Sequence, residues 1–168
     1  MVPDAIVGYF AAATAAAGAL IGLLFVAISL KPEDIFGESA QATPRRLAES
    51  SFTALVNAFF VSLVAIVPRT NLGWVSCIMA LLSLYSTLAR RIHAPDASDI
   101  GTLAFAVVIY LGQLGIGIAL LVVPGDADLV YRLAYLTVAA FAIALARAWA
   151  LMTGHAGKPK APGKPKVS

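Results

Sequence analysis

Two carboxamide side chains, Asn57 and Gln113, have the greatest capacity for chemistry in this chain, because each falls in the middle of a long apolar stretch. A carboxamide carries two N–H donors and an acceptor oxygen, and inside a hydrocarbon core these groups must bond to protein. Such side chains form hydrogen bonds between helices, each contributing about 0.6–2 kcal/mol, or they line a polar path or a small binding cavity. The sequence leaves both uses open.

Hydroxyl side chains continue this polar pattern along two helical faces. A spacing of three, four or seven residues puts side chains on one face of a helix. The residues with this spacing are Ser50, Thr53 and Asn57 in one stretch and Ser76, Ser83 and Thr87 in the next. Such faces are typical of helix–helix contacts, and Thr53 and Ser83 are also candidates for the lining of a pore.

The sequence carries no signature of enzyme chemistry. Cys77 is the single cysteine, so the chain has no internal disulfide. His93 and His155 are far apart and have no carboxylate or thiol neighbours at the spacing of metal ligands. There is no glycine-rich phosphate loop and no GxSxG or HExxH motif. We therefore expect no catalytic residue, no bound metal and no cofactor, and a protein that is not an enzyme.

Ionisable side chains avoid the centres of the apolar stretches. Proton relays and coupling-ion sites place such groups within the membrane, so active proton-coupled transport is not expected. Arg147 comes nearest to an exception, about one turn from the end of the last stretch. We interpret it as an anchor whose long side chain reaches the interface.

The elements that must position these residues are five apolar stretches. Each has about the 20 residues that a helix needs to cross a hydrocarbon core of about 30 Å. The composition agrees, with 60% hydrophobic and 12% charged residues and a mean hydropathy of +0.87, where soluble domains have about 25% charged residues. We predict an all-α membrane protein, a bundle of five transmembrane helices over residues 5–30, 44–67, 72–89, 100–123 and 127–152.

The helices form one predicted domain, residues 1–153, followed by a tail over residues 154–168. The first helix is expected to be retained, because the residues before it lack the basic charge of a signal peptide. The tail repeats Gly-Lys-Pro-Lys and has no apolar pattern, which predicts a disordered basic segment on the cytoplasmic side. Its lysines are expected to contact anionic lipid headgroups, and nothing indicates nucleic-acid binding.

The distribution of basic residues predicts the orientation. Ten of the twelve lie in the loops after the first and third helices or towards the C-terminus, and only Arg69 and Arg132 lie on the other side. Because positive loops stay in the cytoplasm, we predict a multi-pass plasma membrane protein with its N-terminus outside and its C-terminus inside. The expected interfacial anchors are Arg90, Arg91, Arg147, Trp74 and Trp149.

Small residues predict close helix packing. Gly18 and Gly22 form a GxxxG motif in the first helix, and the fourth helix carries Gly112, Gly115 and Gly117. Glycine lets helix backbones approach closely in lipid. The sequence does not decide between packing within one chain and packing between chains, so a homo-oligomer or a membrane-protein partner is expected.

An internal correspondence appears when the chain is shifted by 56 residues. It places Asn57 on Gln113, Pro68 on Pro124 and Arg91 on Arg147. Helices 2–3 and 4–5 would then be two hairpins repeated in the same orientation, with helix 1 as an addition, and parallel-repeat transporters bind at such an interface. The alternative is that any two hairpins of similar length have similar residues at their ends without being a repeat.

The N-terminal half resembles a group of small bacterial integral membrane proteins. Residues 22–30 read Gly-Leu-Leu-Phe-Val-Ala-Ile-Ser-Leu, similar to the "GLxFVAxSL" helix of that group. Residues 44–47, Pro-Arg-Arg-Leu, and 64–68, Val-Ala-Ile-Val-Pro, resemble its arginine segment and the helix ending in "LVP". The group is uncharacterised, and some members are labelled as modulators of a membrane-bound AAA protease. The resemblance implies a bacterial cytoplasmic membrane and brings no catalytic or binding residues with it.

Two functions follow from these patterns. The leading hypothesis is a non-enzymatic accessory or regulatory membrane protein that acts through helix–helix contacts. The alternative is a small oligomeric channel or passive permeation unit, lined by Asn57, Gln113 and the two hydroxyl faces.

Overall fold

The computed structural model describes residues 4–30, 42–93 and 100–152, which form five α-helices. Their bounds are α1 Asp4–Leu30, α3 Ala42–Ala65, α4 Leu72–His93, α5 Ile100–Val122 and α6 Ala127–Met152. Each contains a segment long and apolar enough to cross a membrane. The predicted five-helix, all-α membrane fold is therefore confirmed, while the tail over residues 154–168 and the loop over residues 31–41 lie outside the described residues.

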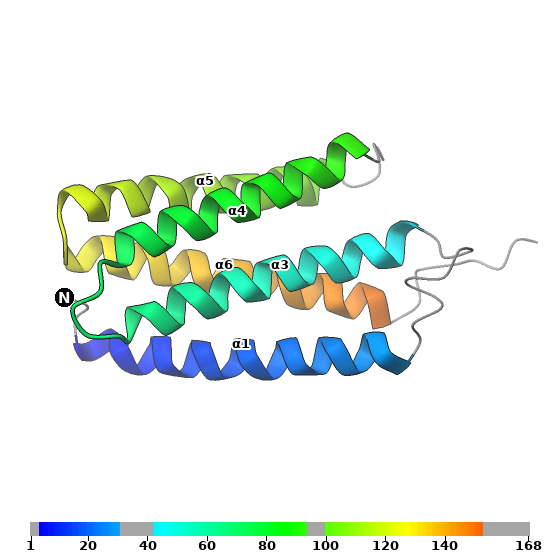
Figure 1. The fold of residues 1–168 in the computed structure, drawn as a ribbon, viewed down its shortest axis with the longest axis horizontal. Coiled ribbons are helices and arrows are strands. Elements are labelled where there is room, and N and C mark those ends of the chain that lie inside the picture. Colours follow the sequence, from blue (N-terminus) through cyan, green and yellow to red (C-terminus); the bar gives the residue numbers. More distant parts are fainter. Residues whose placement is uncertain (1–3, 31–41, 94–99, 153–168) are drawn as a thin grey trace, which may run out of the picture.

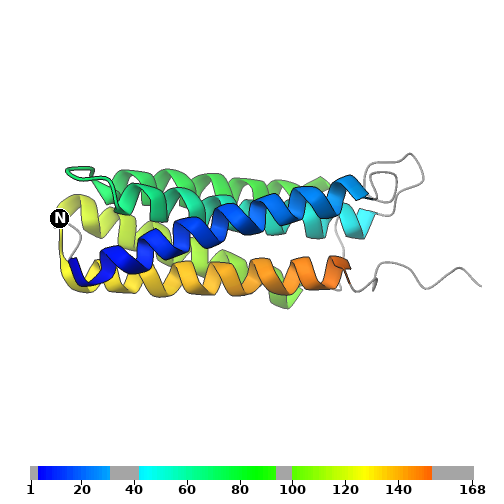
Figure 2. The same ribbon diagram turned by 90° about the horizontal axis from the view of Figure 1, so that it is seen from below.

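The helices lie side by side along one long axis (Figures 1 and 2). Helices α3, α4, α5 and α6 form a ring in which each contacts the next and α6 contacts α3, and α1 packs outside this ring against α3 and α6. We call the end with the α3–α4 and α5–α6 loops the outer end, and the opposite end the inner end. Helix α1 begins at the outer end, beside both loops (Figure 1).

The apolar core differs between the two halves of the bundle. In the outer half, one cluster takes residues from all five helices, with Phe10, Val61, Leu72, Leu120 and Leu133 among them. In the inner half, the core is split into two clusters. One joins α4, α5 and α6, and the other joins α1, α3 and α6. Neither inner cluster contains residues of both α3 and α4.

The two outer loops have the same backbone design. Val67-Pro68-Arg69-Thr70 and Val123-Pro124-Gly125-Asp126 are both turns with proline at the second position. The third residue has a positive φ in each, 63° at Arg69 and 83° at Gly125, as a type II turn requires. In the second loop the Asp126 N–H donates to the Val123 carbonyl at 3.5 Å. The helix predicted to reach residue 67 ends at Ala65, because a residue before proline disfavours the helical conformation.

The arrangement of the helices favours an internal repeat over a chance similarity between the ends of two hairpins. The two turns correspond at the offset of 56 residues, and α3–α4 and α5–α6 run in the same direction (Figure 1). Burial corresponds as well, since Ala54 and Tyr110, offset by 56, are both buried. The differences trace to α1. Leu55 is 2% exposed and packs in a cluster with Leu24 of α1, whereas Leu111, its counterpart, is 52% exposed.

Candidate functional site

Asn57 joins α3 to α4 in the interior of the bundle. Its side chain is only 2% exposed. The Nδ2 group donates to the main-chain oxygen of Met79 at 3.1 Å and to Ser83 Oγ at 2.8 Å. Both carboxamide hydrogens are therefore used in contacts between helices, where water is absent and each such bond stabilises helix association.

Gln113 connects α5 to α4, whereas the helix that matches α4 at the offset of 56 residues is α6. It is 3% exposed, and its Nε2 donates to the main-chain oxygen of Ser76 at 3.2 Å. In return, Ser76 Oγ donates to the main-chain oxygen of Gln113 at 3.3 Å. Both carboxamides predicted from the sequence thus bond to α4, which is the helix that the buried polar groups of α3 and α5 share.

The α4–α5 interface is the closest helix contact that the glycines show. A Cβ atom on Gly73 would lie 2.8 Å from the Gly117 carbonyl oxygen, and one on Gly117 would lie 2.8 Å from Cys77 Sγ. These distances leave no room for a methyl group. Sequence reasoning missed Gly73 because it has no glycine partner at four-residue spacing, and it noted Gly117 only beside Gly112 and Gly115.

The glycines singled out from the sequence lie in looser surroundings. A Cβ on Gly112 would meet Leu136 of α6 at 3.4 Å, and one on Gly18 would meet Phe59 of α3 at 3.7 Å. Gly22 and Gly115 have no heavy atom of the described chain within 4 Å of such a Cβ. Gly18, Gly22 and Gly115 are also exposed. No residue of the described ranges therefore packs closely on Gly22 or Gly115.

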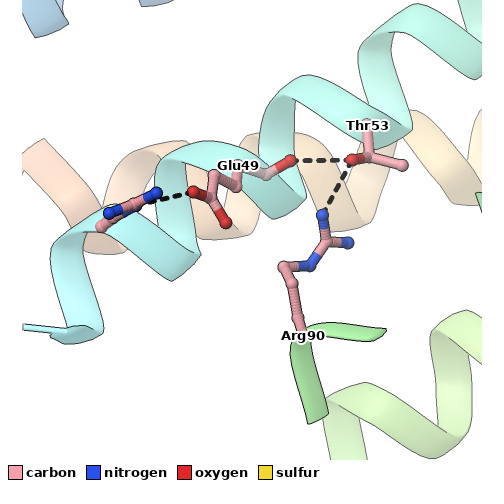
Figure 3. Close-up of polar contacts among 4 residues, drawn as sticks. Glu49, Thr53 and Arg90 are labelled. Atoms are coloured by element: carbon pink, nitrogen blue, oxygen red, sulfur yellow. Dashed lines mark hydrogen bonds and ion pairs between the residues drawn. The ribbon is translucent and has the colours of Figure 1, made fainter. Parts of the chain in front are cut away.

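Towards the inner end, Arg90 crosses from α4 to α3 (Figure 3). Its guanidinium donates from Nη1 to Thr53 Oγ1 at 3.1 Å and from Nη2 to Thr87 Oγ1 at 3.3 Å. Thr53 Oγ1 in turn donates to the Glu49 carbonyl at 2.8 Å, and the Glu49 carboxylate pairs with Arg45 Nε at 2.8 Å. Arg90 thus bonds between helices, and the side chain of Arg91 lies outside the described residues.

The two hydroxyl faces predicted from the sequence meet only in part along this interface, because Ser76 bonds to Gln113 of α5 and Ser50 bonds to Leu47 within α3. Thr53 and Asn57 of α3 face Ser83, Thr87 and Arg90 of α4, joined by the bonds above. We call these five residues the polar seam. It occupies the inner half of the α3–α4 interface, where neither apolar cluster includes both helices. Polar bonds therefore join α3 and α4 in that half.

Arg147 of α6 lies near the polar seam. Its Nη2 donates to the main-chain oxygen of Thr102 on α5 at 3.4 Å. Arg90 lies within electrostatic reach of both Arg147 and Glu49. Of the other predicted anchors, Trp74 and Trp149 are exposed on the helix surface, where aromatic belt residues lie.

A cavity of about 420 Å³ opens at the outer end. Apolar residues of all five helices line it, among them Val7, Ala65, Leu72, Leu120 and Val130, and the loop residues Arg69, Thr70 and Asn71 add polar groups. The Asn71 side chain is already engaged, because its Oδ1 accepts the Gly73 N–H at 3.0 Å as a helix cap. Sequence reasoning missed the cavity, although the two Val-Pro turns that border it were visible as the Pro68–Pro124 correspondence.

Comparisons with known proteins give no identity. The chain matches no protein-family model, no curated protein and no solved structure. Within the described ranges, no three His, Cys, Asp or Glu side chains come together in a way that would hold a metal ion. A function must therefore be argued from the geometry of the helices.

Proposed function

We propose that this five-span membrane protein is a non-enzymatic accessory or regulatory protein that acts through helix–helix contacts with another membrane protein. The observation that carries the proposal is the position of α1, which packs on α3 and α6 from outside the ring. Gly18 and Gly22 are exposed on this helix. Small residues at a lipid-facing surface let the backbone of a second helix approach closely.

The geometry of the polar interior supports contact over permeation. A pore between copies of the chain would need Asn57 and Gln113 on an outer face, but both are buried and bonded to α4. A path between α4 and α5 would have to open the Gly73–Gly117 contact. These bonds favour a solid bundle, and the channel remains the alternative function.

Charge supports a plasma membrane orientation with the N-terminus outside. Among the described residues, the arginines towards the inner end are Arg45, Arg46, Arg90, Arg91 and Arg147, against Arg69 and Arg132 near the outer end. Positive charge is retained in the cytoplasm. Thr70→Cys in the exposed outer loop should react with a membrane-impermeant maleimide in intact cells, and lack of labelling until the cells are broken would reverse the orientation.

The contact hypothesis is tested by photo-crosslinking in native membranes. A photoreactive amino acid at Val26, one turn beyond Gly22 on α1, should yield an adduct with a distinct protein. The same residue at Val108 of α5 is the matched control, since both valines are exposed. A membrane-bound AAA protease is the first partner to probe, because some proteins with a similar N-terminal helix are labelled as its modulators. Lipid adducts alone at both positions would refute the proposal.

A further inference from the structure

We propose that the cavity at the outer end of the bundle binds a small organic acid, a molecule that joins a compact apolar body to a single carboxylate. The apolar body would lie among the helix ends, and Arg69 would bind the carboxylate. The site is separate from the polar seam and from the exposed Gly18–Gly22 face of α1, so it goes beyond the contact function proposed above.

The first support is the size and depth of the cavity. Its volume of about 420 Å³ falls within the roughly 300–1,000 Å³ of small-molecule sites. Each helix contributes an apolar lining residue within three residues, about 5 Å, of its outer end. These residues are Val7, Ala65, Leu72, Leu120 and Val130. One turn deeper, Phe10 and Leu133 are fully buried in the outer apolar cluster. The cavity is therefore shallow and closed below, which suits a compact apolar group better than a long acyl chain.

The second support is the set of polar groups in the loop that borders the cavity. Arg69, Thr70 and Asn71 line it and are exposed, and no acidic residue of the described chain is among its lining residues. Asn71 Oδ1 accepts the Gly73 N–H at 3.0 Å, which leaves the Asn71 amino group as a donor. A positive charge beside hydroxyl and amide donors matches the two acceptor oxygens of a carboxylate.

The third support is the unpaired charge of Arg69. Across residues 4–30, 42–93 and 100–152, its side chain makes no hydrogen bond and no ion pair. Asp126, in the other outer turn, does not line the cavity, and its Oδ1 accepts the Leu129 N–H at 3.0 Å as a helix cap. A guanidinium binds one carboxylate through two parallel hydrogen bonds, so a ligand with a single carboxylate balances the charge of Arg69.

The fourth support is the backbone of the two outer turns. Both need a positive φ at the third residue, and both third residues, Arg69 and Gly125, line the cavity. Gly125 adopts its φ of 83° without strain, whereas the Cβ atom of Arg69 makes a φ of 63° unfavourable. Backbone strain of this kind clusters at ligand-binding positions. The first turn thus keeps a charged side chain at the cavity where glycine would be the relaxed residue.

The test is equilibrium dialysis of radiolabelled phenylacetate against the full chain in nanodiscs, with empty nanodiscs to subtract partition into lipid. Phenylacetate has a compact ring and one carboxylate. Wild type should bind one phenylacetate per chain, in a saturable manner. Phenylacetamide lacks the charge and acetate lacks the ring. Each should compete at least about 10-fold more weakly, as expected for the loss of a charge-assisted hydrogen bond or of a buried apolar group.

Two matched pairs of substitutions locate the site. Arg69→Gln should lower the affinity for phenylacetate about 10-fold, whereas Arg132→Gln removes an exposed charge near the outer end that does not line the cavity and should leave the affinity unchanged. Val7→Phe should fill the cavity from α1 and lower the affinity by at least about 10-fold. Val123→Phe is its control, because Val123 is exposed at the same end and does not line the cavity.

Three results would overturn the proposal. The first is no saturable binding of phenylacetate by wild type, including the case in which a retained phospholipid keeps it out of the cavity. The second is equal affinity for phenylacetate and phenylacetamide, which would show an apolar site without a role for charge. The third is equal affinity of Arg69→Gln and Arg132→Gln for phenylacetate. This last comparison decides even if Val7→Phe fails to fold.

Discussion

Replacing Asn57 with leucine tests the role of the polar seam. Asn57→Leu keeps the number of side-chain heavy atoms but removes the bonds to the Met79 carbonyl at 3.1 Å and to Ser83 Oγ at 2.8 Å. Two such bonds within a membrane contribute about 1–3 kcal/mol together. Met79 is four residues before Ser83 on α4, so the freed Ser83 hydroxyl can donate to the Met79 carbonyl and recover part of this loss. We therefore expect the free energy of unfolding to fall by about 1–2 kcal/mol.

The assay is reversible unfolding in lipid bicelles, with a double-mutant cycle that adds Ser83→Ala. The coupling between Asn57 and Ser83 should be about 0.6–1 kcal/mol. Ser29→Ala is the control. The exposed Ser29 hydroxyl donates to the Phe25 main-chain oxygen within α1 at 2.8 Å, so its removal should change the free energy of unfolding little. A coupling near zero would refute the seam as a source of stability, and a lost solute flux in an undamaged bundle would favour the channel.

Three further substitutions follow from the backbone and the packing. Arg69→Gly should stabilise the fold by about 1 kcal/mol, because Arg69 has a φ of 63° that glycine adopts without strain; a loss of stability in bicelle unfolding would show that its side chain is needed at the outer cavity. Gly117→Ala should lower the free energy of unfolding by about 1–3 kcal/mol, because the added methyl group pushes α5 away from Cys77. Gly115→Ala is the control and should leave the free energy of unfolding unchanged, because Gly115 faces open space. Equal free energies of unfolding for the two variants would contradict the close contact. Ser62→Ala should be neutral or stabilising by about 1 kcal/mol, because the buried Ser62 hydroxyl has no hydrogen-bond partner in the described chain; a clear loss in the same assay would reveal a partner.

The helices were predictable because a membrane imposes them. With no water in the hydrocarbon core, each crossing segment must satisfy its own backbone as a helix, and the apolar length then fixes its limits. Turn chemistry was readable too, since Pro68 and Pro124 stand at the same place in both outer turns. The positive φ of Arg69 was not readable, because arginine rarely adopts it and the proline position alone does not require it.

The contacts of the polar residues were not predictable, because they depend on how each helix is rotated about its axis. Spacing put Thr53 and Asn57 on one face of their helix, but only packing determines which helix that face meets. Arg90 shows the same limit. A residue near a helix end is typical of an interfacial anchor, yet its bonds to Thr53 and Thr87 lie between α3 and α4. The Gly73–Gly117 contact also depends on two helices far apart in sequence.

The measurement that tests the central claim most directly is single-particle imaging of the protein in nanodiscs made from its native membrane. The account predicts a particle in which a helix of a different protein lies against the exposed Gly18–Gly22 face of α1, while Asn57 and Gln113 stay inside each bundle. A symmetric ring of this chain alone, with Asn57 or Gln113 facing a central opening, would contradict it.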